Sequence, residues 1–393
     1  MFDHIKKDIH EFEEQIISWR RDFHQYPELS LEEHRTAKIV ADLLDEFGLD
    51  VATGVGQTGV VGLLEGHCPG RTLLLRADMD ALPIQEENDL PYRSRKPGVM
   101  HACGHDGHTA ILLGLAKFFS RHKQTLPGRI KFVFQPGEEG FNGAEAMIQD
   151  GVLKNPDVDV ALALHLISVI PTGMVGLRSG PMMASADSFR IRITGQGGHG
   201  AMPEGGVDAI LMSAHAITAL QSLISREVSP STPLVVHVGT IQGGQAFNII
   251  AENVEMTGTV RTLDAALQKT IPGRMDRILK GMVESFRGTY EFDYQSGCPT
   301  VVNDPALTHL VERVAGQVLG QDQVFEIPAI MGSDDMAFFL DKVPGCYFCL
   351  GTGNPAKGTD HSHHHNRFNI DEDSLAIGAE VMAHSALTYL TGS

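Results

Sequence analysis

The stretch RIKFVFQ, residues 129–135, decides the class of fold, because it is a short apolar run of the kind that forms a buried strand. Two similar runs, TLLLRA (72–77) and VDVALALHL (158–166), precede and follow it in the sequence. Segments with helical periodicity, at about 106–122 and 143–150, lie between the three runs. Strands that alternate with helices predict an α/β domain with a mostly parallel sheet that helices cover on both faces.

Residues 182–297 follow a different pattern. The predicted elements come in the order strand, helix, two strands, helix and strand, at residues 188–195, 208–227, 233–241, 254–263, 266–287 and 289–295. This βαββαβ order is typical of a ferredoxin-like domain. The α/β pattern then resumes, so we expect one α/β domain made of residues 1–181 and 298–393, with a ferredoxin-like domain of residues 182–297 inserted into it.

The composition excludes several classes of partner. The chain has 393 residues, with 31 Lys and Arg against 49 Asp and Glu, which gives a net charge of −18. Such an acidic chain lacks the basic surface that binding to nucleic acid or to an anionic membrane requires. We find no long apolar run and no signal-peptide pattern, and the five cysteines are too few and odd in number for a disulfide framework. We therefore expect a cytoplasmic protein without nucleic-acid or membrane partners.

The octapeptide HACGHDGH, residues 101–108, concentrates a thiol, three imidazoles and a carboxylate in one loop that leads into a predicted helix. Gly104 separates Cys103 from His105, so the backbone can bend and bring the sulfur and the imidazole to one metal ion. Polar capping of the helix N-terminus is the alternative explanation, but capping requires neither a thiol nor several imidazoles. The chain has 19 histidines in all, and this loop is the first sign that metal chemistry accounts for some of them.

Further candidate ligands follow the other predicted strands. Glu138 and Glu139 come shortly after the strand at 129–135, and His165 lies at the end of the apolar run 158–166. In open α/β sheets, binding sites lie at the carboxyl ends of the strands. Adjacent carboxylates point in different directions, so one can bind metal while the other faces the substrate. A solvated acidic turn and a histidine satisfied within the core are the alternatives for these residues.

A second cluster of histidines, HSHHHNRF (361–368), supplies at least one more candidate ligand. Sulfur, imidazole and carboxylate ligands together suit Zn, Mn, Co or Ni better than Ca or Mg. If one ligand bridges, five protein ligands can hold two metal ions and leave open positions for water and substrate, an arrangement that recurs in hydrolases. We therefore expect two divalent metal ions as cofactors.

Eight motifs occur along the chain in this order: RRDFHQYPELSLEEHRT (20–36), RADMDALPIQE (76–86), MHACGHDGHTA (100–110), FQPGEEG (134–140), ALHL (163–166), GGHGAMP (197–203), FNIIAENVEMTGTVRT (247–262) and GSDDMAFF (332–339). They are spread along the chain from residue 20 to residue 339. In these motifs and their order the chain resembles the hippurate hydrolase and auxin-conjugate hydrolase branch of the aminoacylase/carboxypeptidase metallopeptidase superfamily.

The resemblance implies a binuclear metal site with five protein ligands. These are Cys103 as the bridging ligand, His105 and His165 on one metal ion, and Glu139 and His364 on the other. The C-terminal ligand of the family lies four residues before an aromatic residue, as His364 lies before Phe368, but Asn366 replaces the usual proline. His363 and His365 therefore remain alternatives to His364.

The resemblance also implies roles for carboxylates near the metals. Glu138 matches the general base that deprotonates the metal-bound water. Asp78 and Asp80 match a segment beneath the metals, in which Asp80 orients a metal ligand through a hydrogen bond.

In the inserted domain, His199 resembles a histidine that stabilises the oxyanion, in dimeric relatives from the other subunit. Asn248 and Arg261 resemble groups that hold the carboxylate of the substrate, and a guanidinium suits two-point binding of a carboxylate. A simple turn at His199 and an ordinary surface charge at Arg261 are the alternatives. By the same analogy we expect a homodimer or higher homo-oligomer, with the inserted domain serving as a lid or for dimerisation.

Together the motifs imply a metal-dependent amidohydrolase that acts on linear amides, with an N-acyl-amino acid or a short peptide as its small-molecule substrate. We expect Glu138 to take a proton from the attacking water and to pass it to the leaving amine. A dipeptidase or carboxypeptidase and an N-acetyl-diaminopimelate-type deacetylase are the nearest alternatives. A cysteine hydrolase with Cys103 as its nucleophile and a non-catalytic metal-binding protein are more distant ones.

Overall fold

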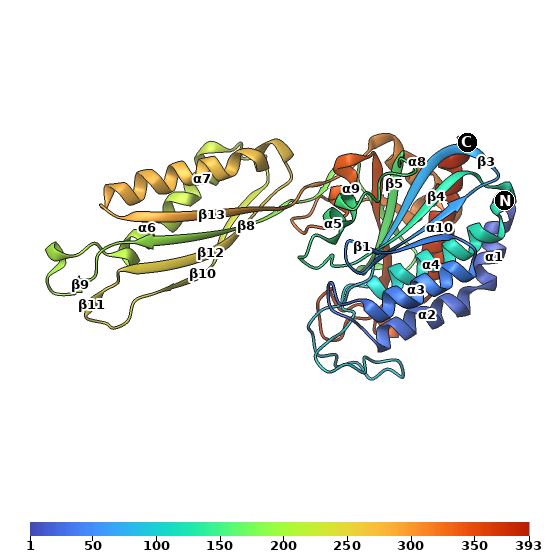
Figure 1. The fold of residues 1–393 in the computed structure, drawn as a ribbon, viewed down its shortest axis with the longest axis horizontal. Helices are drawn as coiled ribbons and strands as arrows, with labels where there is room; N and C mark the ends of the chain where they lie inside the picture. The colour runs from blue at the N-terminus through green and yellow to red at the C-terminus, as the bar shows by residue number, and fades with distance from the viewer. Residues whose placement is uncertain (393) are drawn as a thin grey trace. The chain divides into compact units, whose positions relative to one another are not determined.

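The computed structural model describes residues 1–392, which form two compact units (Figure 1). Unit 1 contains Met1–Gly180, Val302–Pro328 and the chain from Asp335 onward, and unit 2 contains Pro181–Val301 and Ala329–Asp334. Residues 329–334 thus pack with unit 2, although the sequence pattern assigns them to the α/β domain. Hydrogen bonds attach this segment to unit 2, because the N–H of Ala184 donates to the carbonyl oxygens of Ile330 (3.1 Å) and Gly332 (2.8 Å).

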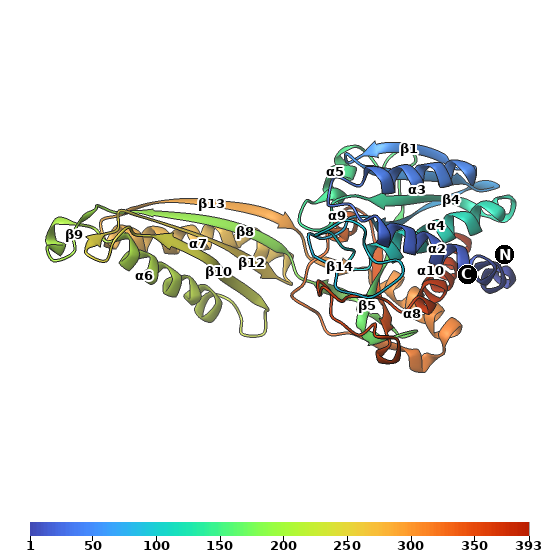
Figure 2. The same ribbon diagram turned by 90° about the horizontal axis from the view of Figure 1, so that it is seen from below.

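A sheet of eight strands forms the middle of unit 1 (Figure 2). In order across the sheet, the strands are β1 (Asp50–Val55), β2 (Gly59–Glu65), β4 (Pro127–Gln135), β3 (Cys68–Asp78), β5 (Val160–Pro171), β16 (Gly345–Gly353), β6 (Val175–Leu177) and β15 (Val324–Glu326). The central strands β4, β3, β5 and β16 run parallel, whereas β2 pairs antiparallel with β1 and β4, and β6 pairs antiparallel with β16. The predicted mostly parallel sheet is confirmed, with an antiparallel hairpin added at one edge.

Helices cover both faces of this sheet, as the alternation of strands and helices predicts. The helices of unit 1 are α1 (Ile5–Glu11), α2 (Glu13–Gln25), α3 (His34–Glu46), α4 (His105–Arg121), α5 (Gly143–Gln149), α8 (Pro305–Leu319), α9 (Met336–Lys342) and α10 (Asp373–Thr391). Helices α4 and α10 pack on one face of the central strands, and α5 and α9 lie on the other face (Figure 1). Across residues 1–392, none of the helices has both the length and the hydropathy that a membrane span requires.

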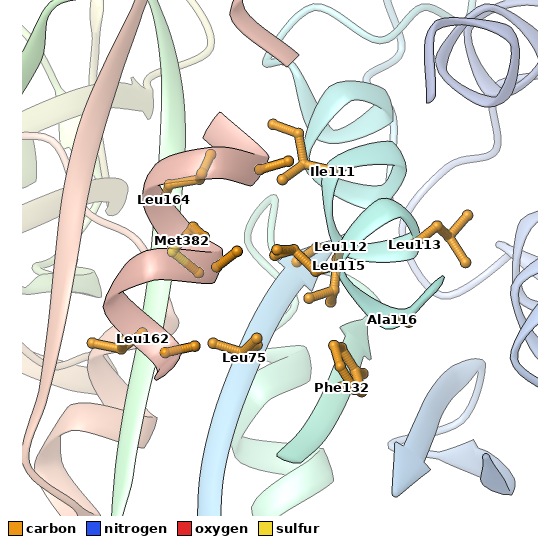
Figure 3. Packing of buried hydrophobic residues seen from close by; sticks show 14 of the residues in the cluster. Leu75, Ile111, Leu112, Leu113, Leu115, Ala116, Phe132, Leu162, Leu164 and Met382 are labelled. Atoms are coloured by element: carbon orange, nitrogen blue, oxygen red, sulfur yellow. The ribbon is translucent and has the colours of Figure 1, made fainter. Parts of the chain in front are cut away.

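The hydrophobic core of unit 1 lies between the central strands and helices α4 and α10. Phe132 of β4 is fully buried, and Leu75 of β3 and Leu162 of β5 are buried beside it. Figure 3 shows these side chains with Leu115 of α4 and Met382 of α10 in the same cluster. This packing anchors α4, so the residues at the start of that helix are held against the carboxyl ends of the strands.

Unit 2 contains a four-stranded antiparallel sheet. In order across the sheet, its strands are β10 (Leu234–Gly243), β12 (Asn253–Thr262), β8 (Ala186–Thr194) and β13 (Thr289–Cys298). Helices α6 (Ala209–Ser222) and α7 (Ala265–Ser285) pack on this sheet and on each other. On β8, Phe189 and Ile191 are buried while Arg190 between them is exposed, so the helices cover one face only. The sequence of elements and the strand order confirm the predicted ferredoxin-like βαββαβ fold.

Four short strands complete the set of elements. They are β7 (Gly180–Met183), which pairs with β14 (Val301–Asn303), and β9 (Gly198–His199), which pairs with β11 (Ile249–Ile250).

The apolar run 158–166 predicts a strand that ends near His165. This prediction is wrong, because β5 continues to Pro171. The extra residues are held by β16, with Ile167 opposite Gly351 and, after a shift in register, Pro171 opposite Gly353. Strand β3, in contrast, pairs with β5 only as far as Ala163. His165 therefore lies just beyond the part of β5 that pairs with β3.

Candidate metal centre

Seven potential metal ligands come together in unit 1. They lie at the start of α4, in the loop after β4, on β5 and in the loop before α10. They form three groups, in each of which one ligand atom per residue lies within 4.8 Å of the others: Cys103 with His165 and His363, Cys103 with Glu139 and His364, and His105 with Glu138 and Glu139. The structure thus brings together the five ligands that the resemblance implies, and it places His363 near them as well.

Cys103 is common to two of the three groups. Its Sγ lies 3.6 Å from Nε2 of His165. In its other group, Nε2 of His364 and Oε1 of Glu139 are 3.2 Å apart. A thiolate shared between two sets of ligands is what a bridging role requires. Burial raises the pKa of the Cys103 thiol, so a cation is needed to keep it deprotonated.

The glycine between Cys103 and His105 has the conformation that the sequence suggests. Gly104 adopts a φ of +93°, in the left-handed region that favours glycine, and α4 begins directly after it. The sharp turn sends the chain into the helix while both flanking side chains stay in the site.

His105 presents one ring nitrogen to the site. Its Nδ1 donates to the backbone oxygen of Asp80 at 2.9 Å and lies 3.2 Å from Oδ1 of the same residue. Among the described residues, Nε2 of His105 is one buried atom without a hydrogen-bond partner. Buried polar atoms without partners are costly unless an ion or a water binds them. The residues present therefore fit a metal ion.

A buried network of ion pairs, which the sequence did not predict, lies beside His105. Arg76 donates from Nη1 to Oδ2 of Asp78 at 2.6 Å and from Nη2 to Oδ1 of Asp335 at 2.9 Å. Burial acts to raise the pKa of Asp78, but the Arg76 guanidinium holds it well below its usual range. Burial acts to lower the pKa of His105, but the carboxylate of Asp78 raises it well above its usual value.

Asp335 belongs to the motif GSDDMAFF (332–339) and directly precedes α9. Its carboxylate makes no capping hydrogen bond to α9, which begins at the next residue. Besides Arg76, it accepts from Nε2 of Gln135 at 2.7 Å and from the N–H of Ala144 at 3.0 Å. Asp335 therefore braces the end of β4 and the start of α5, on either side of the loop that carries the adjacent glutamates.

No role was predicted for the N-terminal motif at 20–36. Two of its residues also support the site. Arg20 is fully buried on α2 and donates to Oδ2 of Asp106 and to Oδ1 of Asn369, both at 2.8 Å. Glu33 accepts from the N–H of Gly137 at 2.9 Å, just before the adjacent glutamates.

Two predicted residues lie side by side in unit 2. His199 is in β9, and Asn248 directly precedes β11, the strand that pairs with β9. Nδ1 of His199 accepts from the N–H of Ala201 at 3.0 Å. The backbone carbonyl of Asn248 accepts from the N–H of Gly200 at 2.9 Å. The predicted turn therefore exists, and it carries both side chains.

Arg261 lies on β12 within the same unit. Its Nη1 donates to the backbone oxygen of Met331 and to Oγ of Ser333, each at 3.2 Å. The guanidinium is therefore held by the segment 329–334 rather than standing as an isolated surface charge.

The chain is similar to known proteins along most of its length. The model of peptidase family M20/M25/M40 matches residues 74–388. Thermostable carboxypeptidase 1 of Saccharolobus solfataricus is 40% identical over 391 residues, which cover 98% of each chain. An N-acyl-L-amino acid amidohydrolase of Geobacillus stearothermophilus is 47% identical over 302 residues, 77% of this chain and 81% of that protein. The crystal structure of a Bacillus subtilis protein, described as a dinuclear metal binding peptidase from the M20 family, matches with a TM-score of 0.84 and 33% identity over 97% of this chain and 99% of that one.

Proposed function

Since this chain belongs to peptidase family M20/M25/M40, whose members are metal-dependent hydrolases of amide bonds, we propose that its substrate is an N-acyl-amino acid. The observation that carries the proposal is the placement of the adjacent Glu138 and Glu139, whose carboxylates lie within 4.8 Å of each other and of a ring nitrogen of His105. Such a pair supplies a metal ligand and a general base at one place. The Geobacillus stearothermophilus relative, named for this activity, supports the choice of substrate class.

The metal site in this proposal holds two divalent ions, of Zn, Mn, Co or Ni. Cys103 would be shared by the two ions, with His105, His165, Glu139 and His364 as the residues that would complete their ligands. The donor types support this assignment, since a thiolate and imidazoles favour these ions. When bound, the ions polarise the acyl carbonyl and acidify an attacking water.

Glu138 is the general base of the proposed reaction. It accepts a proton from the attacking water and returns it to the amine as the amide bond breaks, a role that contributes about 10²–10⁴-fold in comparable enzymes. The backbone of its neighbour Glu139 is fixed, because that N–H donates to Oδ2 of Asp80 at 3.0 Å. The loop is thereby held while the carboxylate of Glu138 serves the reaction.

His199 is proposed to stabilise the oxyanion. Because Nδ1 of His199 accepts from the N–H of Ala201, the proton of the neutral ring is on Nε2. An Nε2–H donor is what a developing oxyanion requires, and one such donor contributes about 3–4 kcal/mol. Asn248 and Arg261 are proposed to hold the substrate carboxylate, for which a guanidinium has the right geometry.

The proposed assembly is a homodimer of a cytoplasmic enzyme, in which unit 2 serves as a lid or for dimerisation. Supporting this, unit 2 exposes large apolar side chains, of which Phe247 is fully exposed and Met202 and Ile249 are about half exposed. Apolar groups exposed together are typical of interaction surfaces. Light scattering of the purified chain tests this part of the proposal, because a monomer at micromolar concentration would contradict it.

A metal assay paired with a substrate panel tests the proposed function. The panel contains N-acetyl and N-benzoyl amino acids, N-acetyl-diaminopimelate and dipeptides, each measured before and after treatment with a chelator. We expect about two metal ions per chain and hydrolysis of N-acyl-amino acids that is lost with the metal and restored by adding it back. Hydrolysis that persists in metal-free protein would contradict the proposal and would favour Cys103 as a nucleophile.

A carboxypeptidase is the second candidate, and the similarity to the Saccharolobus solfataricus carboxypeptidase favours it. The same panel separates the two. Faster hydrolysis of peptides than of N-acyl-amino acids would replace the proposed substrate class with peptides and leave the proposed metal site intact.

A further inference from the structure

Three histidine side chains bind the backbone of one residue, Leu166. Its N–H donates to Nε2 of His108 at 2.9 Å. Its carbonyl oxygen lies 2.9 Å from Nδ1 of His165 and 2.8 Å from Nε2 of His363. Leu166 directly follows His165 on β5, whereas the other two histidines come from α4 and from the loop before α10. The backbone of one residue thus joins three of the elements that build the metal centre.

The direction of each hydrogen bond follows from the backbone atom. An amide N–H only donates, so Nε2 of His108 carries a lone pair and its proton is on Nδ1. That proton is donated to Oδ1 of Asp78, at 2.6 Å. A carbonyl oxygen only accepts, so the protons of His165 and His363 are on the nitrogens that face Leu166. The opposite nitrogens, Nε2 of His165 and Nδ1 of His363, are left with lone pairs.

One of these lone pairs faces the metal centre, because Nε2 of His165 lies 3.6 Å from Sγ of Cys103. One ring nitrogen of His363 belongs to the same group of close ligand atoms. The position of the Leu166 carbonyl therefore sets which nitrogen these two rings leave unprotonated. The nitrogen that a histidine offers to a metal is generally chosen by the hydrogen bond of the other nitrogen.

His108 itself has no lone pair to offer. Its ring also forms a close group with Asp78 and His105, which by proximity alone makes it a candidate ligand. Both of its nitrogens are already engaged, with Asp78 on one side and Leu166 on the other. Asp78 is held in turn by Arg76, and all of these side chains are buried. The series of contacts Arg76–Asp78–His108–Leu166 is therefore a buried support that ends at the N–H of Leu166, the residue whose carbonyl two candidate ligands contact.

We propose that His108 is a positioning residue, which holds the backbone of Leu166 so that His165 and His363 direct their unprotonated nitrogens at the metals. The proposal rests on the metal site of the proposed function, although it does not depend on which amide is cleaved. The proposal gives His108, the last histidine of HACGHDGH, a role that the ligand spacing did not suggest. It also makes His363 one of the side chains whose orientation depends on Leu166.

Two substitutions separate the two bonds of His108. In His108→Gln, the amide oxygen reaches the position of Nε2 and can still accept from the N–H of Leu166. In His108→Asn, the shorter amide can replace only Nδ1, so the contact with Asp78 remains and the contact with Leu166 is lost. The readouts are the dissociation constant for Zn²⁺ and Mn²⁺ from chelator competition, the metal content, and the melting temperature of the metal-free protein.

We expect His108→Asn to weaken metal binding about 10–100-fold, as loss of a supporting hydrogen bond to a metal ligand commonly does. We expect the metal dissociation constant of His108→Gln to stay within about threefold of the wild-type value. This variant keeps the hydrogen bond to Leu166, and it is the loss of such a bond that weakens binding strongly. Equal weakening in both variants would overturn the proposal, and so would a lower metal content in both, which would make His108 a ligand. A loss of affinity that merely parallels the melting temperatures would also overturn it, because that result indicates general destabilisation.

A measurement on the wild type keeps the proposal testable if His108→Asn does not fold. In metal-free protein labelled with ¹⁵N-histidine, the signals that disappear in His108→Gln must belong to a ring protonated at Nδ1. A ring protonated at Nε2 would overturn the proposal. If the wild type binds metal but hydrolyses no N-acyl-amino acid, the proposed substrate fails while the Gln–Asn comparison still decides the role of His108. If the wild type binds no metal, the proposed function fails and so does the positioning role.

Discussion

The carboxylate of Asp80 supports His105 and the loop of the adjacent glutamates at the same time. Its Oδ1 lies 3.2 Å from Nδ1 of His105, and its Oδ2 accepts from the N–H of Glu139 at 3.0 Å and from Oγ of Ser30 at 2.6 Å. Burial acts to raise the pKa of Asp80, but the bond with His105 lowers it, so the group stays ionised. One buried anion therefore orients side chains from α4 and from the loop after β4.

Asp80→Asn should weaken metal binding about 10–100-fold while the fold is retained. The amide keeps the shape of the carboxylate, but one of its ends becomes a donor and faces another donor. Chelator competition with Zn²⁺ measures the effect, and Asp89→Asn, at an exposed position nearby in the sequence, is the matched control. Metal affinity within twofold of the control would show that Asp80 does not orient a ligand.

Metal binding should tighten as the pH rises. The pKa of His105 is raised, with burial opposing the increase and Asp78 causing it, and burial raises the pKa of the Cys103 thiol. Both groups must lose a proton before they can bind a metal, so affinity falls as the pH falls. Titration calorimetry in buffers of different ionisation enthalpy should show proton release on binding and an affinity that increases between pH 6 and 8. A flat profile without proton release would contradict this prediction.

Arg20→Met should destabilise the protein by about 3–5 kcal/mol at pH 7, because it leaves the buried carboxylate of Asp106 without its cation. Burial acts to raise the pKa of Asp106, but Arg20 holds it well below its usual range. A lowered pKa contributes stability above the unfolded value of about 4 and loses it as the pH falls below that value. Urea unfolding at pH 7 and at pH 3.5 should therefore show the larger difference between variant and wild type at pH 7. An equal difference at both values would point to lost packing instead.

Phe132→Ala should cost about 3–5 kcal/mol without changing the metal stoichiometry. The ring is fully buried between β4 and α4, so its removal leaves a cavity in the core shown in Figure 3. Thermal unfolding and metal content measure the two effects. The exposed Phe247→Ala serves as the control and should change stability by less than about 0.5 kcal/mol.

Much of the fold could be predicted because its central elements have strong periodic patterns. The helix expected at about 106–122 is α4 (His105–Arg121), and the buried run at 129–135 lies within β4. Strand β1 gave no such signal, because DVATGV is mostly exposed at the sheet edge and lacks the alternation of a half-buried strand. Strands of three residues, such as β6 and β15, are too short for any periodic pattern.

The candidate site was predictable to the extent that its side chains carry chemistry. Cys103, His105 and the adjacent glutamates stood out by residue type and spacing, and the structure brings them together. Several of the supporting contacts did not stand out, because they involve backbone atoms, as in the bond of Glu33 with Gly137. A backbone N–H or carbonyl is present at nearly every position, so no sequence pattern distinguishes the peptide that a buried side chain will bind.

Glu138→Gln tests the central claim, that a glutamate beside the metal ligands drives amide hydrolysis. Metal content and turnover of an N-acyl-amino acid are measured on the same preparation, with the exposed Glu32→Gln as the control. The account predicts two metal ions per chain in both proteins and a turnover number that is about 10²–10⁴-fold lower in Glu138→Gln than in the control. Turnover within a few-fold of the control, with the metal retained, would contradict it.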